Sequence, residues 1–101
     1  MEVRMSKPVA CSLAPGDLAE RRGRWLRLCD RALSSTEATE NGVRLRFRRL
    51  DAVEHELRDL AALERECCSF AAWSVSSQRG ELVLEVSAQG DAVAAVRAMV
   101  C

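Results

Sequence analysis

The chain of 101 residues has no tyrosine, only two prolines and one histidine, and no net charge. Lys+Arg and Asp+Glu both number 15, so there is no basic footprint of the kind that binds nucleic acid. No segment approaches the roughly 20 apolar residues of a membrane span, and we expect no membrane partner. The amino-terminal residues MEVRMSKPVAC lack the apolar stretch of a secretory signal. We therefore expect a cytoplasmic protein.

Several motifs with known chemistry are also missing. The sequence has no Ser/His/Asp order, no Gly-rich phosphate loop and no zinc-ribbon spacing of cysteines. Because an acid, a base and an activated nucleophile are not visible together, an enzyme is the least supported class, although a metal-dependent reaction stays open. The single histidine, His55, follows Glu54 in a charged stretch and fits a solvated surface position better than a ligand.

What the chain does have is five cysteines. Its length supports one domain, residues 1–101, and its 49% hydrophobic and 30% charged residues are typical of a globular protein. Cytosolic thiols are normally reduced, and five is an odd number, so a disulfide framework is disfavoured. Each cysteine is then core filler, a redox group or a metal ligand.

Hydrophobic periodicity predicts an α+β fold, with an antiparallel sheet of four to five strands packed against two main helices and a short C-terminal helix. Ferredoxin-like topology is the nearest named option. Asp51 and Glu54 suggest a capping box, and Asn41-Gly42 suggests a hairpin turn. Helices are expected at 16–33, at 51–68 and after Gly90, and strands at 8–13, 43–48, 70–77 and 81–87, with 34–41 a loop or weak strand.

The spacing of residues also predicts which side chains face the core. On the first helix the expected apolar face consists of Leu18, Trp25, Leu26, Cys29 and Leu33, and the arginines lie opposite. On the second helix the expected stripe consists of Val53, Leu57, Leu60 and Cys67, while the acids, Glu64 among them, form a solvated face. Arg44, Arg46 and Arg48 should point outward and pair with Glu81 and Glu85.

The sharpest feature is the adjacent pair Cys67 and Cys68, which comes where the second helix is expected to end. Neighbouring side chains on a regular helix point about 100° apart, but at a helix end the backbone can turn and both sulfurs can converge. Two thiolates at one place attract soft ions such as Hg(II), As(III), Cu(I) or Zn(II). The helix C-terminus and nearby acids disfavour a reactive thiolate, whereas a soft metal can still displace the thiol protons.

A third sulfur is needed for a trigonal site, and Cys11 is the best candidate for it. Cys11 precedes the first helix, so it approaches Cys67 and Cys68 if the two helices are antiparallel. Cys101 is a weaker candidate at a chain terminus, and Cys29 fits the core.

The runs LAALERECCSF, ACSL and GVRLRF resemble a group of small bacterial proteins that carry a Glu-Cys-Cys-Pro-Phe motif before a two-stranded segment. The resemblance covers most of the chain, with Ser69 in place of the usual proline. It implies that Cys11, Cys67 and Cys68 act together, in a setting of heavy-metal resistance. It implies no reaction.

The main hypothesis is therefore a cytoplasmic thiol protein that binds a soft metal or metalloid ion through Cys11, Cys67 and Cys68, for sequestration, delivery or sensing. A thiol redox switch is one alternative, because neighbouring cysteines can close a strained, easily reduced disulfide. An interaction module or homodimer without metal is another.

Overall fold

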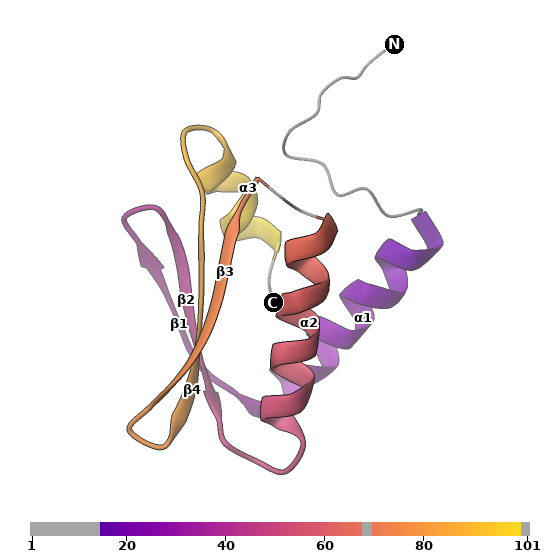
Figure 1. Ribbon diagram of the computed structural model, residues 1–101, viewed down its shortest axis with the longest axis vertical. Coiled ribbons are helices and arrows are strands. Elements are labelled where there is room, and N and C mark those ends of the chain that lie inside the picture. The colour runs from indigo at the N-terminus through magenta and orange to yellow at the C-terminus, as the bar shows by residue number, and fades with distance from the viewer. Residues whose placement is uncertain (1–14, 68–69, 100–101) are drawn as a thin grey trace.

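The computed structural model describes residues 15–67 and 70–99, which form three helices and one four-stranded sheet (Figure 1). The fold is α+β, of a ferredoxin-like type, as the sequence predicts. A helix followed by a hairpin occurs twice, and a short helix completes the described chain. In order, the elements are α1 (Pro15–Ala32), β1 (Leu33–Thr39), β2 (Gly42–Arg48), α2 (Val53–Cys67), β3 (Ala72–Gln78), β4 (Glu81–Ser87) and α3 (Ala92–Met99).

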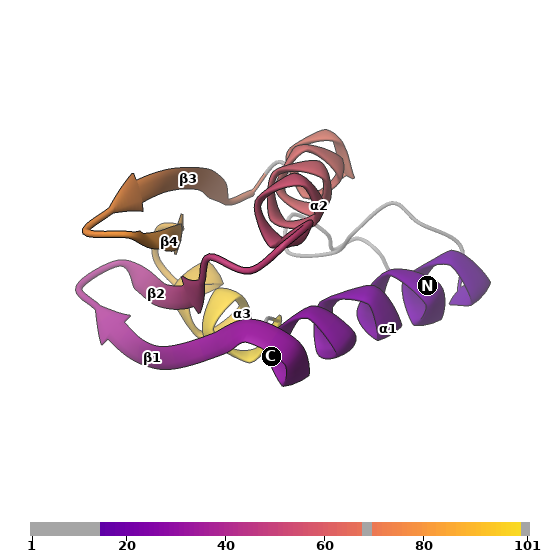
Figure 2. The same ribbon diagram turned by 90° about the horizontal axis from the view of Figure 1, so that it is seen from below.

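The sheet has the order β1-β2-β4-β3, and every pair of neighbouring strands is antiparallel. The two hairpins therefore meet through their second strands, β2 and β4, in the centre. All three helices lie on one face of the sheet (Figures 1 and 2). The expected weak strand at 34–41 is strand β1, and the expected strand at 8–13 lies outside the described residues.

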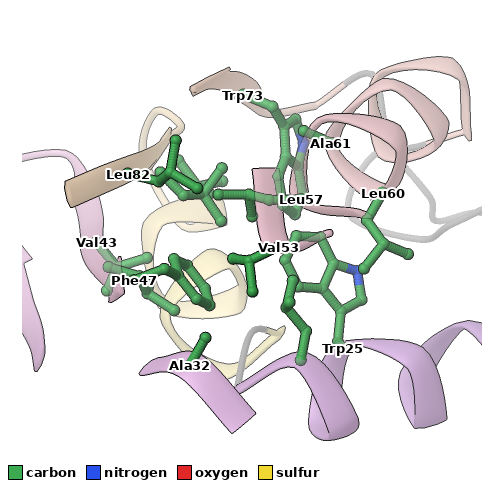
Figure 3. Packing of buried hydrophobic residues seen from close by; sticks show 14 of the residues in the cluster. Trp25, Ala32, Val43, Phe47, Val53, Leu57, Leu60, Ala61, Trp73 and Leu82 are labelled. Atoms are coloured by element: carbon green, nitrogen blue, oxygen red, sulfur yellow. The ribbon is translucent and has the colours of Figure 1, made fainter. Parts of the chain in front are cut away.

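The core lies between the inner face of the sheet and the helices (Figure 3). The alternation of β2 predicts its inward residues correctly, because Val43, Leu45 and Phe47 are all buried. Leu82, Leu84 and Val86 are the inward residues of β4. Burial of large aliphatic side chains of this kind contributes about 1.5–3 kcal/mol each, so the two central strands hold the fold together.

The outer face of the sheet is mostly polar, although the buried Val83 also belongs to it. Arg44 donates to the Glu85 carboxylate on the neighbouring strand at 2.6 Å, as expected from the cross-strand pairing. The hydrogen bonds that Arg44 donates to Glu85, and then to Glu37, raise the pKa of its guanidinium above the ordinary value. Glu81 instead accepts a hydrogen bond from Ser34 at 3.0 Å.

Both hairpins form, but their turns differ. Arg79 and Gly80 both have positive φ angles, 54° and 81°, which is the geometry of a type I′ turn. The first hairpin turns at Glu40-Asn41, one residue earlier than predicted, and Gly42 already belongs to β2. Gly42 is required for a different reason, because a Cβ there would lie 1.9 Å from the Val86 carbonyl oxygen.

The buried face of α1 differs from the prediction. Leu18 and Leu26 are 40% and 46% exposed, whereas Trp25, Leu28 and Ala32 are buried. Trp25 is buried as predicted, and the predicted Cys29 and Leu33 pack half-buried against the core, so the prediction is wrong only for Leu18 and Leu26 and missed Leu28 and Ala32.

The start of α2 differs as well. It begins at Val53, and Glu54 accepts from Arg49 at 2.8 Å and Arg58 at 2.9 Å instead of closing the expected capping box with Asp51. Two guanidinium groups compete successfully for the carboxylate because charged hydrogen bonds are stronger than a bond to one backbone N–H.

Candidate thiol site

Helices α1 and α2 run antiparallel, which is the arrangement that the predicted site requires. Near the end of α1, Arg31 donates to the backbone carbonyl of Asp51, just before α2, at 2.6 Å. Near the start of α1, Arg21 donates to Glu64, in the last turns of α2, at 3.1 Å. The start of α1 and the end of α2 therefore lie at the same end of the molecule (Figure 1).

Glu64 is the buried polar residue that links these two helix ends. Its side chain comes from α2, and the residue is only 5% exposed. One carboxylate oxygen, Oε2, accepts from Trp25 Nε1 at 2.9 Å and from Arg21 Nη1 at 3.1 Å. Burying a carboxylate is costly unless it is paired and hydrogen-bonded, and these two contacts offset that cost.

Trp25, which donates to Glu64, also packs against a second tryptophan. The rings of Trp25 on α1 and Trp73 on β3 have centroids 5.9 Å apart and are tilted by 32° (Figure 3). Arg65 Nε donates to the Trp73 carbonyl at 3.0 Å, which ties the start of β3 to the last turn of α2. Within the described residues, the buried Trp73 Nε1 has no hydrogen-bond partner, in contrast to Trp25 Nε1.

Two arginines of α1, Arg21 and Arg24, donate hydrogen bonds to acids of α2. Arg24 contacts Glu56 at 2.8 Å and Asp59 at 2.9 Å, beside a cavity of about 240 Å³ that Arg27 and Arg31 also line. The hydrogen bonds that Arg24 donates to Glu56, and then to Asp59, raise the pKa of its guanidinium above the ordinary value. Because acids of α2 already pair with Arg24, this cavity lies between two helices and is lined by side chains of both charges.

Of the cysteines predicted to form the site, Cys67 is the last residue of α2. Its side chain, together with Cys11 and Cys68, lies outside the described residues. Cys101 lies outside them as well. The structure therefore describes the start of α1 and the end of α2, and the convergence of the cysteine sulfurs stays a prediction.

Cys29 differs from the buried free thiol that its place in the sequence suggests. It packs half-buried against the core, as expected, but it is disulfide-bonded. Cys29 lies between Arg24 and Arg31 on α1, level with residues 51–56, whereas Cys67 is about 16 Å further along α2 than Glu56. A disulfide requires Cα atoms about 4.4–6.8 Å apart, so the bond of Cys29 does not include Cys67.

The part of the chain that the structure describes contains no group of side chains that could hold a metal ion. No cluster of three or more His, Cys, Asp or Glu side chains occurs there. His55 is exposed on α2 and precedes Cys67 by 12 residues, about 18 Å along the helix axis. It is therefore remote from the predicted site.

Sequence reasoning missed Glu64 because it counted this residue with the solvated acids. The signal was present in the spacing, since Glu64 follows the buried Leu57 by seven residues and Leu60 by four. These intervals place it on the apolar stripe of α2. A buried tryptophan also needs an acceptor for its indole N–H, and the prediction of Trp25 in the core implied such a partner.

No protein-family model matches the chain, and neither a curated protein nor a solved structure is significantly similar to it. Among the described residues, none of the helices has the length and apolar composition that crossing a membrane requires.

Proposed function

We propose that this chain is a thiol protein that captures a soft metal or metalloid ion through Cys67 and Cys68, with Cys11 as the third ligand. The observation that supports the proposal is the antiparallel packing of α1 and α2, held by Arg21 and Glu64. Cys11 precedes Pro15 by four residues, so an extended chain allows it to reach at most about 14 Å from the start of α1. The start of α1, which Cys11 precedes in the chain, and the end of α2, where Cys67 is the last residue, lie at the same end of the molecule.

The chemistry of the ligands determines the class of ion. Thiolates prefer soft ions, and Hg(II), As(III), Cu(I) and Zn(II) are the candidates. Binding displaces the thiol protons, so ion affinity should fall as the pH is lowered, whatever the intrinsic thiol pKa. Capture of this kind serves sequestration, delivery or sensing in the cytoplasm, in a setting of heavy-metal resistance.

The direct test is to titrate the fully reduced protein with Hg(II) and with arsenite while recording thiolate-to-metal charge-transfer absorption. We expect one ion per chain and loss of that ion in the Cys67→Ser/Cys68→Ser double variant. The matched control is Cys29→Ser/Cys101→Ser, which removes two cysteines but should retain the ion. Unchanged stoichiometry in the first variant would contradict the proposal.

The disulfide at Cys29 favours a second candidate function, thiol redox chemistry. Disulfides are rare in the cytosol, and those that occur there are usually catalytic or redox-sensing. In this case mild peroxide would take two protons and two electrons from the Cys67 and Cys68 thiols, form a disulfide between them and be reduced to water. Mass spectrometry would then show the loss of two hydrogens within one peptide, and inert thiols would exclude this candidate.

A further inference from the structure

We propose that the cavity between the second half of α1 and the start of α2 binds a phosphate dianion, either free phosphate or the phosphate group of a small monoester. The cavity has a volume of about 240 Å³ and is lined by Arg24, Arg27, Leu28, Arg31, Ala52 and Glu56. Pockets for drug-sized ligands measure roughly 300–1,000 Å³, so this one suits a small anion. The inference goes beyond the proposed function and involves none of the thiols.

The cationic wall of this cavity belongs to a single helix. Arg24, Arg27 and Arg31 occupy positions i, i+3 and i+7 of α1, and side chains at these spacings share one face of a helix. The end of α1 lies beside the start of α2, because Arg31 reaches the backbone just before α2 (Figure 1). Three guanidinium groups therefore border one concave surface between the two helices.

The positive charge of this wall is only partly balanced. Arg24 is paired, at 2.8 Å to Glu56 and at 2.9 Å to Asp59. Arg31 instead donates to the backbone carbonyl of Asp51 at 2.6 Å, which is a neutral acceptor and leaves the charge of the guanidinium in place. Within the described part of the chain, Arg27 has no acidic partner either. Two uncompensated cations beside one cavity favour an anionic ligand.

Two of the three arginines are also held in position. Glu56 accepts from both Nε and Nη2 of Arg24, at 3.1 and 2.8 Å, and the Asp51 carbonyl fixes one Nη2 donor of Arg31. A guanidinium has five N–H donors, so the Nη1 group of Arg24 and most donors of Arg31 stay available to a ligand. Side chains that are already ordered lose less conformational entropy when a ligand binds.

The chemistry of the donors selects phosphate among small anions. A guanidinium fork matches the oxygens of phosphate in a bidentate contact, and a phosphate dianion presents enough oxygens for several arginines at once. Glu56 does not repel such a ligand strongly, because its carboxylate is already paired with Arg24. Ala52, on the other side of the cavity, has a φ of 66°, and residues in this uncommon conformation cluster at ligand sites.

The test is isothermal titration calorimetry with inorganic phosphate and with glycerol 3-phosphate, at low ionic strength and about pH 8, where both probes are doubly charged. We expect one saturable site per chain. Arg27→Gln and Arg31→Gln should each weaken binding about 10-fold or more, because each removes charge-assisted hydrogen bonds. The matched control is Arg22→Gln. It removes the same charge from an exposed position about 200° around α1 from Arg24, so it should bind nearly as well as the wild type.

The outcomes separate a built site from general attraction to a cationic helix. Equal losses of affinity in Arg22→Gln and Arg31→Gln would overturn the proposal, as would the absence of saturable binding of either probe by the wild type. Tighter binding of glycerol 3-phosphate would assign the site to a monoester, and equal affinities would assign it to free phosphate. If a variant does not fold, amide chemical shifts of the wild type decide: phosphate should move residues 24–31 and 51–56, and shifts confined to other segments would contradict the site.

Discussion

At the scale of the residue, a comparison of Trp25 with Trp73 measures how much one buried hydrogen bond contributes to stability. Both indoles are buried in the same cluster, but only Trp25 donates its N–H to an acceptor among the described residues, Glu64. Replacing either tryptophan by phenylalanine removes the same ring area. Only the change at position 25 leaves a buried carboxylate without one of its donors.

We therefore expect Trp25→Phe to lower the free energy of unfolding by about 1–3 kcal/mol more than Trp73→Phe, which is the cost of an unsatisfied buried polar group. Urea denaturation followed by circular dichroism measures both variants on one scale. Equal losses would mean that the contact between Trp25 and Glu64 adds nothing beyond packing.

The glycines Gly42 and Gly23 provide a second comparison at this scale. A Cβ at Gly42 would lie 1.9 Å from the backbone oxygen of Val86, and neither strand can move away without breaking the central pairing of the sheet. At Gly23 the nearest atom, at 3.1 Å, is the end of the flexible Arg27 side chain. We expect Gly42→Ala to destabilise the fold by at least about 1–3 kcal/mol, as overpacking does.

Gly23→Ala should instead stabilise the fold by about 0.5–1 kcal/mol, because alanine is the better helix former. The melting temperatures of the two variants should therefore move in opposite directions. A Gly42→Ala protein as stable as the wild type would show that the sheet is not as closely paired at this position as the structure indicates.

At the scale of the element, the start of α2 depends on Glu54. Hydrogen bonds from Arg58 and then Arg49 hold the pKa of the Glu54 carboxyl below its ordinary value. A lowered folded-state pKa means that the contribution of Glu54 to stability is present above its unfolded-state pKa. That contribution is lost as the pH falls through the folded-state value.

We expect Arg58→Gln to move the pKa of Glu54 back towards that of a free glutamate, and Arg49→Gln to do so less. Carboxyl titration by NMR measures each value directly. The two variants should also be less sensitive to acid between the two pKa values, because the folded and unfolded states then bind protons alike. An unchanged Glu54 pKa in both variants would show that neither arginine holds the carboxylate in solution.

The elements themselves follow closely from local sequence pattern. The alternation in 42–48 and 81–87 places apolar residues on one face of each strand, and both strands form as predicted. The pattern is weaker in 33–39, where no continuous apolar face exists. This segment becomes strand β1 because β2 provides a pairing edge, which is a contact that local sequence does not contain.

At the scale of the whole molecule, the disulfide of Cys29 requires a second cysteine among the other four of the sequence. The geometry of α1 and α2 excludes Cys67, and Cys68 is adjacent to it. Cys29 lies 14 residues after Pro15, about 21 Å along α1, which is beyond the easy reach of Cys11. We therefore expect Cys101, two residues after α3, to be the partner.

Peptide mapping without reductant measures this pairing. The peptide that contains Cys29 should be linked to the C-terminal peptide, and Cys11, Cys67 and Cys68 should be alkylated before any reduction. This arrangement keeps all three proposed ligands free while the disulfide joins α1 to the end of the chain. A link from Cys29 to Cys11 would remove the third ligand in the oxidised protein.

The sequence by itself determined the α+β class, the two long helices, the central strands and the place of the vicinal cysteines at the end of a helix. Each of these features depends on patterns within a few consecutive turns or strand residues, where spacing alone decides which side chains share a face. The zero net charge, and the few aromatic and proline residues, also come from the sequence alone.

Only the tertiary structure decided that α1 and α2 are antiparallel and that Glu64 is buried between Arg21 and Trp25. It also decided that α1 turns Leu28 and Ala32 inward and leaves Leu18 and Leu26 exposed. The physical reason is that two helical faces of similar apolar character are equivalent until a second helix packs on one of them. A charged residue on that contact becomes buried when a partner far away in the sequence satisfies it.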